Sequence, residues 1–451
     1  MASPNYYDVT GWPVGNPHED IGEVINSIIA DIKSRQTSPD VNGAGKPGAA
    51  IYIPPGDYRL ATQVVIDLSF LKIFGSGHGF TSSSIRFNTP SQELARWHEV
   101  WPGGSRILVD LAPQTEGDEA VGAAFLIKRA GNPRISSVEF ADFCIDGLHF
   151  QGGGPGAGDP ENSYMNGKTG IYIASANDSF RITGMGIIYL EHGVTVYDAD
   201  ALTLDNNFIA ECGNCVEFKG KGQACRVANN LIGAGYNGHS IHAANYGGML
   251  VSANNVFPRG ASSLHFSGVA RSSVTGNRFH SFYPGMLVFA DNCSENLVSA
   301  NHFLRDREPW APMTAYDNGL DDQFGLLHIR GSNNSVIANH ISLSIDTRYI
   351  RPPAARPVII NVLSGSGNYI ANNHVVATTE DAETTEAPNS ACFATQVGAL
   401  LATQNLRPLE VTSVSVAQGS SQNTILDSGS AAEVVVDRAV NAFRPTPLPG
   451  E

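Results

Sequence analysis

The stretch Leu204-Asp-Asn-Asn207-Phe-Ile209 contains the pattern that decides the fold: an apolar residue, two residues, an asparagine, one residue and an apolar residue. The same frame returns six times, at Val227-x-x-Asn230-x-Ile232, Val251-x-x-Asn254-x-Val256, Val274-x-x-Asn277-x-Phe279, Val298-x-x-Asn301-x-Phe303, Val336-x-x-Asn339-x-Ile341 and Ile370-x-x-Asn373-x-Val375. Successive asparagines are 23, 24, 23, 24, 38 and 34 residues apart, and a period in the low twenties is typical of a solenoid. We therefore predict an all-β, right-handed parallel β-helix, its hand following the usual crossover rule.

The repeated asparagine is expected at a bend between strands. Its side chain bonds backbone groups there and tolerates a left-handed backbone. Asparagines stacked in register can also satisfy one another's amides in a column. Because each repeat buries its apolar face only by stacking on its neighbours, the two ends of the solenoid need caps.

The segments on either side of the repeats suggest how the ends are covered. Residues Asp20 to Arg35 carry an isoleucine and valine stripe with helical spacing, which predicts an amphipathic capping helix. We predict an N-terminal segment with this helix (1–48), the β-helix (49–378) and a C-terminal part (379–451) with a linker, a short helix (Ala391 to Asn405) and strands. Two insertions, Gln151 to Gly167 and Arg305 to Phe324, are long enough to be walls or lids of a site.

Composition restricts the partners. The net charge of −15 argues against nucleic acid and anionic membranes. No apolar run approaches the ~20 residues of a membrane span, and the N-terminus lacks the basic and apolar regions of a signal peptide. A cytoplasmic location is therefore expected, and nothing in the sequence indicates a cofactor.

The six cysteines are too few for a disulfide framework. Cys212 and Cys215 form a Cys-Gly-Asn-Cys motif, but no second Cys/His pair follows at ligand spacing, and no βαβ unit surrounds it. We interpret both as reduced thiols packed at a corner of a coil.

The ladder also gives side-chain directions, since alternate residues of a strand face opposite ways. Aligning the strands that follow each repeat places Tyr172, Thr195, Glu217, His242, His265, Val288 and His328 in one outward column. A lone ionisable strand residue is ordinarily a solvated surface group, but a Glu beside histidines and a tyrosine offers acid/base chemistry. A zinc site of Glu217, His242 and His265 is the alternative; we predict no metal, because ligands in register on parallel strands seldom converge on a tetrahedron.

The segment from Asp205 to Glu217 resembles the active-site stretch of the inulin fructotransferases and the difructose anhydride III hydrolases. Asn255 to Gly260, Phe282 to Met286 and Asn318 to Asp322 strengthen the resemblance, which covers about residues 50 to 380. It implies a right-handed β-helix, a homotrimer with active sites at subunit interfaces, and β-2,1-linked fructans as substrates. In these segments Arg259, Tyr283, His265 and Asp322 are candidates for binding fructosyl hydroxyls, and the column adds His242 and Tyr172.

The family pattern pairs an Asp and a Glu eleven residues apart. Glu217 matches the Glu, with a general acid/base role, while the Asp position carries Asn206. An amide has no charge and accepts no proton at neutral pH. We interpret the chain as an inactivated variant; Asp205 could substitute only if it faced the same way as residue 206, which strand alternation disfavours.

Three functions remain open. The expected cytoplasmic location favours a hydrolase that opens difructose anhydride III to inulobiose over a fructotransferase that cuts a difructose dianhydride from extracellular inulin. A calcium-dependent lyase would need an acidic calcium cluster, for which Asp321 and Asp322 are the conspicuous pair. A trimeric carbohydrate-binding β-helix without activity is the third class.

Overall fold

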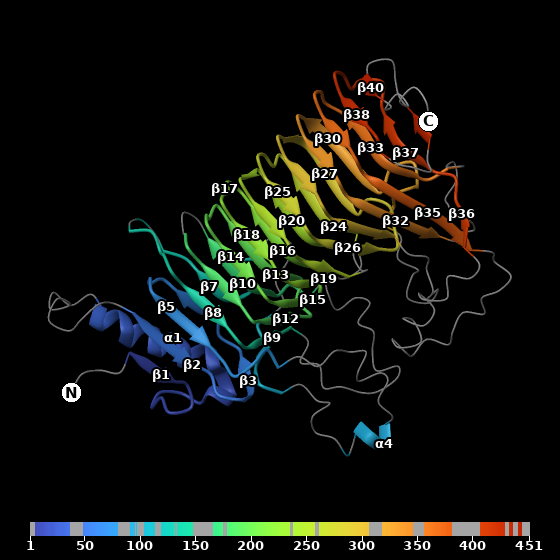
Figure 1. Ribbon diagram of the computed structural model, residues 1–451. Helices are drawn as coiled ribbons and strands as arrows, with labels where there is room; N and C mark the ends of the chain where they lie inside the picture. The colour runs from blue at the N-terminus through green and yellow to red at the C-terminus, as the bar shows by residue number, and fades with distance from the viewer. Residues whose placement is uncertain are drawn as a thin grey trace. The chain divides into compact units, whose positions relative to one another are not determined.

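The chain forms two compact units, Met1–Gly235 and Tyr236–Glu451. Each is built from three β-sheets whose strands run parallel (Figure 1), with one antiparallel pair in the second unit. The computed structural model describes residues 5–36, 48–79, 91–94, 96, 103–112, 119–129, 131, 133–147, 166–174, 178–234, 238–257, 261–305, 318–345, 356–380, 406–428, 433–435 and 441–443. The predicted right-handed parallel β-helix is confirmed.

Helix α1 (Pro17–Gln36) includes the predicted helix and starts three residues earlier, with a break at Asp20 (φ −153°, ψ 94°). The break follows from a cap: Asp20 Oδ1 accepts hydrogen bonds from the backbone N–H of Gly22 at 3.0 Å and of Ala61 at 3.1 Å. A side-chain oxygen in this position satisfies donors that the first turn of a helix leaves open. The same carboxylate therefore starts the helix and ties it to the first coil.

The apolar stripe of α1 is buried, from Ile21 at 0% exposure to Ile32 at 3%. The helix packs on β3 (Gly56–Leu60) and β4 (Val64–Ile66), the end strands of two sheets. The Asn26 side chain forms two hydrogen bonds with the backbone beside β4. Its amide donates to Gln63 O at 2.8 Å, and its oxygen accepts from Val65 N at 3.0 Å. The helix thus covers the apolar end of the coil and satisfies part of an open sheet edge, as a cap must.

The first unit has three sheets, which we call A, B and C. Sheet A runs through β1 (Tyr6–Asp8), β2 (Ala49–Tyr52), β5 (Leu71–Phe74), β8 (Glu139–Ala141), β11 (Arg181–Thr183), β14 (Thr203–Asp205) and β18 (Arg226–Ala228). Sheet B runs through β3, β6 (Ser105–Val109), β9 (Cys144–Asp146), β12 (Gly186–Ile188), β15 (Phe208–Cys212) and β19 (Leu231–Ala234). Sheet C runs through β4, β7 (Ala123–Ile127), β10 (Thr169–Ala174), β13 (His192–Tyr197) and β16 (Asn214–Lys219). Outside these sheets lie α4 (Ser91–Leu94) and β17 (Gly222–Gln223).

The second unit repeats the plan. Its sheet A holds β22 (Leu250–Ser252), β25 (Ser273–Thr275), β28 (Leu297–Ser299), β31 (Ser335–Ile337), β34 (Tyr369–Ala371), β38 (Thr424–Leu426) and β40 (Asn441–Phe443). Sheet B holds β23 (Asn255–Val256), β26 (Arg278–Ser281), β29 (His302–Arg305), β32 (His340–Ile345), β35 (His374–Glu380) and β36 (Leu406–Pro408). Sheet C holds β20 (His239–Ala244), β24 (Ser262–Ser267), β27 (Leu287–Ser294), β30 (Leu327–Ser332), β33 (Val358–Ser364), β37 (Thr412–Val416) and β39 (Glu433–Val435). The two-residue β21 (Tyr246–Gly247) lies outside them.

The asparagine ladder is confirmed and lies inside the coils. In the second unit, the side-chain oxygen of Asn301 accepts from both the backbone N–H (3.0 Å) and the amide (2.9 Å) of Asn277, and Asn339 receives the same pair from Asn301. In the first unit Asn230 receives the pair from Asn207. Each rung thus satisfies a buried backbone group and a buried amide of its neighbour.

A second column stands at another corner of the second unit and was not recognised from the sequence. Asn296, Asn334, Asn368 and Asn423 bond one another in the same way, at 38, 34 and 55 residues of separation. The separations of 38 and 34 repeat those of the first ladder, and this was the signal available in the sequence.

The coils continue past residue 378, where the sequence placed the end of the β-helix. Strands β37 and β38 pair in parallel with β33 and β34, and β39 and β40 follow. Here the frame reads Ile425-x-x-Ser428, and the Ser428 hydroxyl accepts from the amide of Asn373 at 3.1 Å. The asparagine frame therefore does not include this rung. The predicted helix from Ala391 to Asn405 lies outside the described residues.

Of the predicted thiols, Cys212 and Cys215 are fully buried at the corner between β15 and β16, and neither is in a disulfide bond. Burial raises the pKa of Cys215 well above its ordinary value. Cys215 therefore stays protonated and inert, as a packing residue does. No helix in the described part of the chain is long and apolar enough to cross a membrane.

Candidate active site

The outward column has the predicted register within each unit. In the first, Tyr172 on β10 pairs with Thr195 on β13, and Thr195 pairs with Glu217 on β16. In the second, the order is His242, His265, Val288 and His328. Glu217 belongs to the first unit, and the three histidines belong to the second.

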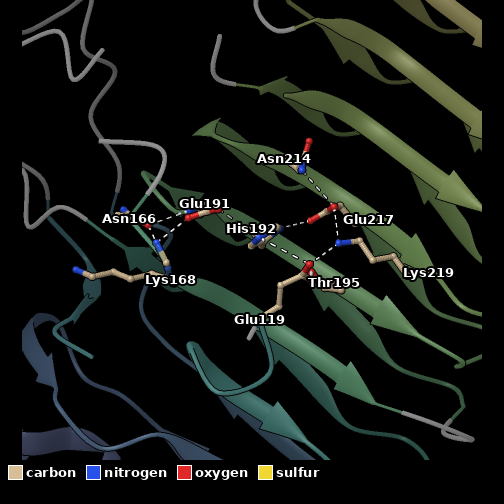
Figure 2. A network of polar contacts seen from close by, with 10 residues as sticks. Glu119, Asn166, Lys168, Glu191, His192, Thr195, Asn214, Glu217 and Lys219 are labelled. Atoms are coloured by element: carbon tan, nitrogen blue, oxygen red, sulfur yellow. Dashed lines mark hydrogen bonds and ion pairs between the residues drawn. The ribbon is translucent and has the colours of Figure 1, made fainter. Parts of the chain in front are cut away.

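Glu217 points away from the coil interior and is nevertheless buried, with 2% of its side chain exposed. Its Oε2 lies 2.5 Å from His192 Nδ1. Its Oε1 lies 2.9 Å from Lys219 Nζ and accepts a hydrogen bond from Asn214 Nδ2 at 3.2 Å (Figure 2). A carboxylate buried this deeply needs such partners, because its desolvation otherwise costs several kcal/mol.

A second carboxyl group reaches this site from the turn before β7. Glu119 Oε1 lies 2.5 Å from Lys219 Nζ, and Thr195 Oγ1 donates to Glu119 Oε2 at 3.3 Å. Glu119 is the more exposed of the two carboxyl groups, at 18% of its side chain. Lys219 therefore bridges two glutamates that lie about 100 residues apart in the chain (Figure 2).

His192 lies between the carboxyl groups. Its Nε2 is 3.8 Å from an oxygen of Glu119 and 3.8 Å from one of Glu191, on the opposite side of the ring from Glu217. Burial lowers the pKa of His192, but its hydrogen bond to Glu217 and the charges of Glu217 and Glu119 outweigh burial, and the pKa is raised. The imidazolium form therefore persists to higher pH than in an ordinary histidine.

The carboxylates of this site also raise the pKa of Lys219 and of Tyr172. Burial lowers the pKa of Lys219, yet the charges of Glu217 and Glu119 and its bonds to both outweigh this, so its pKa is raised. Burial, followed by the charge of Glu119, raises the pKa of Tyr172 to about 12. The Tyr172 phenol is thus a neutral hydrogen-bonding group that faces the same side of the sheet as Glu217.

The insertion from Gln151 to Gly167 ends beside this network. Gly167 N donates to Glu191 Oε2 at 2.7 Å, and the Asn166 side chain accepts from Glu191 N at 3.1 Å. Residues 148–165 lie outside the described part of the chain. The described end of this insertion fixes Glu191, and through it the Nε2 side of His192.

Donor atoms of Glu119, His192 and Glu217 lie within 4.8 Å of one another, a spacing that a metal ion could use. The Lys219 ammonium, however, stands 2.5 Å from one of these carboxylates and 2.9 Å from the other. A cation is thus already present between the two acids, and the arrangement favours a charge network over a metal centre. We identify no metal site here.

The structure does not bring Asn206 beside Glu217 of the same chain. Asn206 is exposed at the corner between β14 and β15, whereas Glu217 lies on β16 in sheet C. Its φ of 57° is left-handed, as at Asn229 one coil later. The prediction from strand alternation was wrong at residue 206, because the strand has already ended at Asp205. Asp205 does not replace it, since its carboxylate accepts from the Asn229 amide at 2.8 Å.

The histidines of the second unit form their own group. The rings of His242 and His265 are 5.3 Å apart, and His239 stacks on His265 at 4.7 Å. Burial, then the charge of His242, lowers the pKa of His265 to about 4, and burial with Arg330 lowers that of His328 to about 4. Both rings are therefore neutral at pH 7. The Nδ1 atoms of both are buried and have no hydrogen-bond partner among the described residues.

The remaining predicted binding residues lie in different settings. Asp322 is buried and ion-paired with Arg305, so it closes the base of the insertion from Arg305 to Phe324. Tyr283 is partly exposed in a turn, where its backbone N–H bonds Ser281 Oγ at 3.1 Å. Arg259 lies outside the described residues, as do residues 306–317 of the insertion.

Sequence reasoning missed His192, Lys219 and Glu119. The first two could have been found, because His192 is in register with Asn214, three residues before Glu217, and Lys219 is two residues after it on the same face. Glu119 carries no such signal. It precedes β7 in a segment without the asparagine frame, and only the fold brings it to β16.

Comparison with known proteins agrees with this architecture. A family model described as the beta helix repeat of inulin fructotransferase matches residues 300–447, and one for the periplasmic copper-binding protein NosD matches residues 146–319. An inulin fructotransferase (DFA-I-forming) of Arthrobacter globiformis is 43% identical over 377 residues, covering 82% of this chain and 89% of that protein.

Solved structures of a DFA-IIIase from Arthrobacter chlorophenolicus A6 are also similar. The complex with DFA-III is 63% identical with a TM-score of 0.89, covering 99% of both chains. The same enzyme without its lid is 58% identical with a TM-score of 0.84, covering 99% of this chain and 100% of that one. The resemblance seen in the sequence is thereby confirmed: the chain belongs to the family of the inulin fructotransferases and DFA-IIIases.

Proposed function

We propose that this protein is a fructan-processing enzyme that hydrolyses difructose anhydride III to inulobiose, with Glu217 as the general acid. The observation that carries the proposal is the buried Glu217 carboxyl group, held by His192, Lys219 and Asn214 on the outward face of sheet C. The similar A. chlorophenolicus structures, solved with DFA-III bound, support this substrate. A ketosidic oxygen leaves only if it is protonated, which a positioned carboxylic acid can do.

The reaction also needs a second carboxyl group, to activate water and stabilise the oxocarbenium-like transition state. We propose that position 206 supplies it across a subunit interface in a homotrimer. Residue 206 is exposed on a corner and lies away from Glu217 of its own chain, so it can serve only a site on another copy. In this chain the position holds Asn206, and we expect slow turnover as a result.

Asn206→Asp should then raise the rate of opening of difructose anhydride III by about 10²–10⁴-fold, the usual size of a general acid/base contribution. The change is structurally mild, since Asp also tolerates a left-handed backbone. Asn372→Asp is the matched control: it places the same charge on an exposed corner residue of the second unit, also at positive φ, and should leave the rate unchanged.

An unchanged rate in Asn206→Asp would contradict the role of position 206. If in addition Glu119→Gln abolished turnover, the second carboxyl group would be Glu119, which the same chain already brings within 4.8 Å of Glu217.

The runner-up is a fructotransferase that releases a dianhydride from inulin, the activity named for the A. globiformis relative. We favour the hydrolase because of the higher identity to the DFA-IIIase structures, 63% against 43%. We place the enzyme in the cytoplasm, where a cell would open an imported disaccharide.

A further inference from the structure

Glu217 poses a problem for its proposed role, because an acid must carry a proton and two of its partners are pure donors. Lys219 and Asn214 both contact Oε1, and neither an ammonium nor an amide N–H accepts a proton. Protonation of Glu217 therefore takes place at Oε2, which faces His192 Nδ1 at 2.5 Å. Of these three partners, His192 is the one that can both give and take a proton at neutral pH.

We propose that His192 and Glu217 hold one proton between them, on the imidazole in the resting site and on Glu217 when the substrate's ketosidic oxygen arrives. This inference rests on the proposed hydrolase function and deepens it. His192 is a positioning residue in this scheme, since it acts through Glu217 and does not touch the reacting bond.

The step balances without a further reactant. The proton leaves His192 Nδ1, enters Glu217 Oε2 and passes to the ketosidic oxygen as its bond to the anomeric carbon breaks. Water, activated by the second carboxyl group, then adds its hydroxyl to that carbon. The proton that this carboxyl group takes from the water is released to solvent, and the His192–Glu217 pair takes one proton back from solvent. The net change is the addition of one water across the ketosidic bond.

The surroundings of His192 stabilise a proton on the ring. Glu119 and Glu191 face Nε2 at 3.8 Å each, while Lys219 opposes them across Glu217. Tyr172, on the neighbouring strand β10, stays neutral, and the Lys168 ammonium is turned to the backbone oxygens of Val109 and Gly147. Acidic groups therefore dominate around the ring, in agreement with the raised pKa of His192.

His192→Gln tests the pair through the pH profile of kcat/KM. The proton on the wild-type pair is lost only as the pH rises through the raised pKa of His192, so activity persists on the alkaline side. Without the imidazole, the alkaline limb should move to lower pH by about one unit or more, a ten-fold loss at a fixed pH on that limb. Added imidazole should restore part of the rate. His374→Gln, which removes an exposed histidine on sheet B of the second unit, should leave the profile unchanged.

A uniform loss of activity with an unmoved alkaline limb and no rescue by imidazole would overturn the proposal, because a merely structural role predicts that result. The profiles are best recorded with Asn206→Asp as the parent, where the proposed function expects the higher rate.

A second measurement does not depend on turnover. The imidazole signals of ¹⁵N-labelled His192 should titrate above pH 6.5 in the native chain, and Glu217→Gln should lower that midpoint by about one unit or more. A midpoint that Glu217→Gln leaves unchanged would overturn the proposal. If the His192 midpoint shifts as expected but no dianhydride is opened, the shared proton is supported and the proposed hydrolase function is wrong. If the dianhydride is opened but neither the pH profile nor the midpoint changes, only the shared proton is wrong.

Discussion

Glu217→Gln should lower the rate of difructose anhydride III opening by about 10²–10⁴-fold, the largest loss of activity that we expect from a single substitution in this chain. Glutamine has the same shape but carries no transferable proton, so the ketosidic oxygen would leave unprotonated. Binding should change little, because the amide oxygen can still accept from Lys219 and Asn214, which now contact Oε1. The loss should therefore appear in kcat, with KM nearly constant.

The measurement is steady-state kinetics on the cyclic disaccharide, made in the native chain and with Asn206→Asp as the parent. Glu139→Gln is the matched control, since Glu139 lies on sheet A of the same unit and pairs with Arg181 at 3.6 Å on the surface. Its loss should leave kcat unchanged. A Glu217→Gln enzyme that kept its full rate would remove the acid from our mechanism.

Asn301→Ala should reduce the stability of the second unit by about 3–5 kcal/mol, the largest effect on folding that we expect from the polar residues. Asn301 is buried, and its side-chain oxygen accepts from the backbone and amide N–H groups of Asn277. Its own amide donates to Val274 O at 2.9 Å and Asn339 Oδ1 at 3.0 Å. Removing it leaves four buried groups without this partner, and each such group costs about 1–3 kcal/mol when fully unsatisfied. We place the total well below the sum because relaxation recovers part of it.

Denaturant unfolding followed by circular dichroism gives the comparison. Asn255→Ala, at an exposed position whose side chain meets Arg278 at 3.2 Å, should change stability by no more than about 0.5 kcal/mol. Asn301→Ser should fall between the two, as Ser428 shows that a hydroxyl can accept from the ladder. Equal stability of Asn301→Ala and Asn255→Ala would mean that the ladder does not hold the coils together.

The repeat predicted the fold well because one physical requirement sets it. Successive coils stack in register, so each of these coils has its apolar residues, its bend and its buried amide at equivalent positions. The asparagines from Asn207 to Asn373 therefore recur in one frame. The same register predicted the order of Tyr172, Thr195 and Glu217 on neighbouring strands. The frame did not predict a rung where a residue other than asparagine accepts the hydrogen bond, as Ser428 does.

The site was harder to predict, since Glu119 comes from a segment without the asparagine frame. Strand alternation gave the outward direction of Glu217 but not its burial, which depends on residues such as Glu119 that reach over the sheet. Alternation also misled at Asn206, because a left-handed corner residue follows no strand period. The register of the strands predicts the sheet face that carries the site. The groups that the connecting segments add to that face cannot be predicted from the register.

We propose that this enzyme opens a cyclic fructose disaccharide, and an analysis of its reaction products tests that activity. The native chain and Asn206→Asp would each be incubated separately with difructose anhydride III and with inulin, and the products separated by chromatography. We predict inulobiose from the dianhydride, formed faster by Asn206→Asp, and no dianhydride from inulin. Release of a dianhydride from inulin, with difructose anhydride III left untouched, would rule out the hydrolase and identify the protein as a fructotransferase.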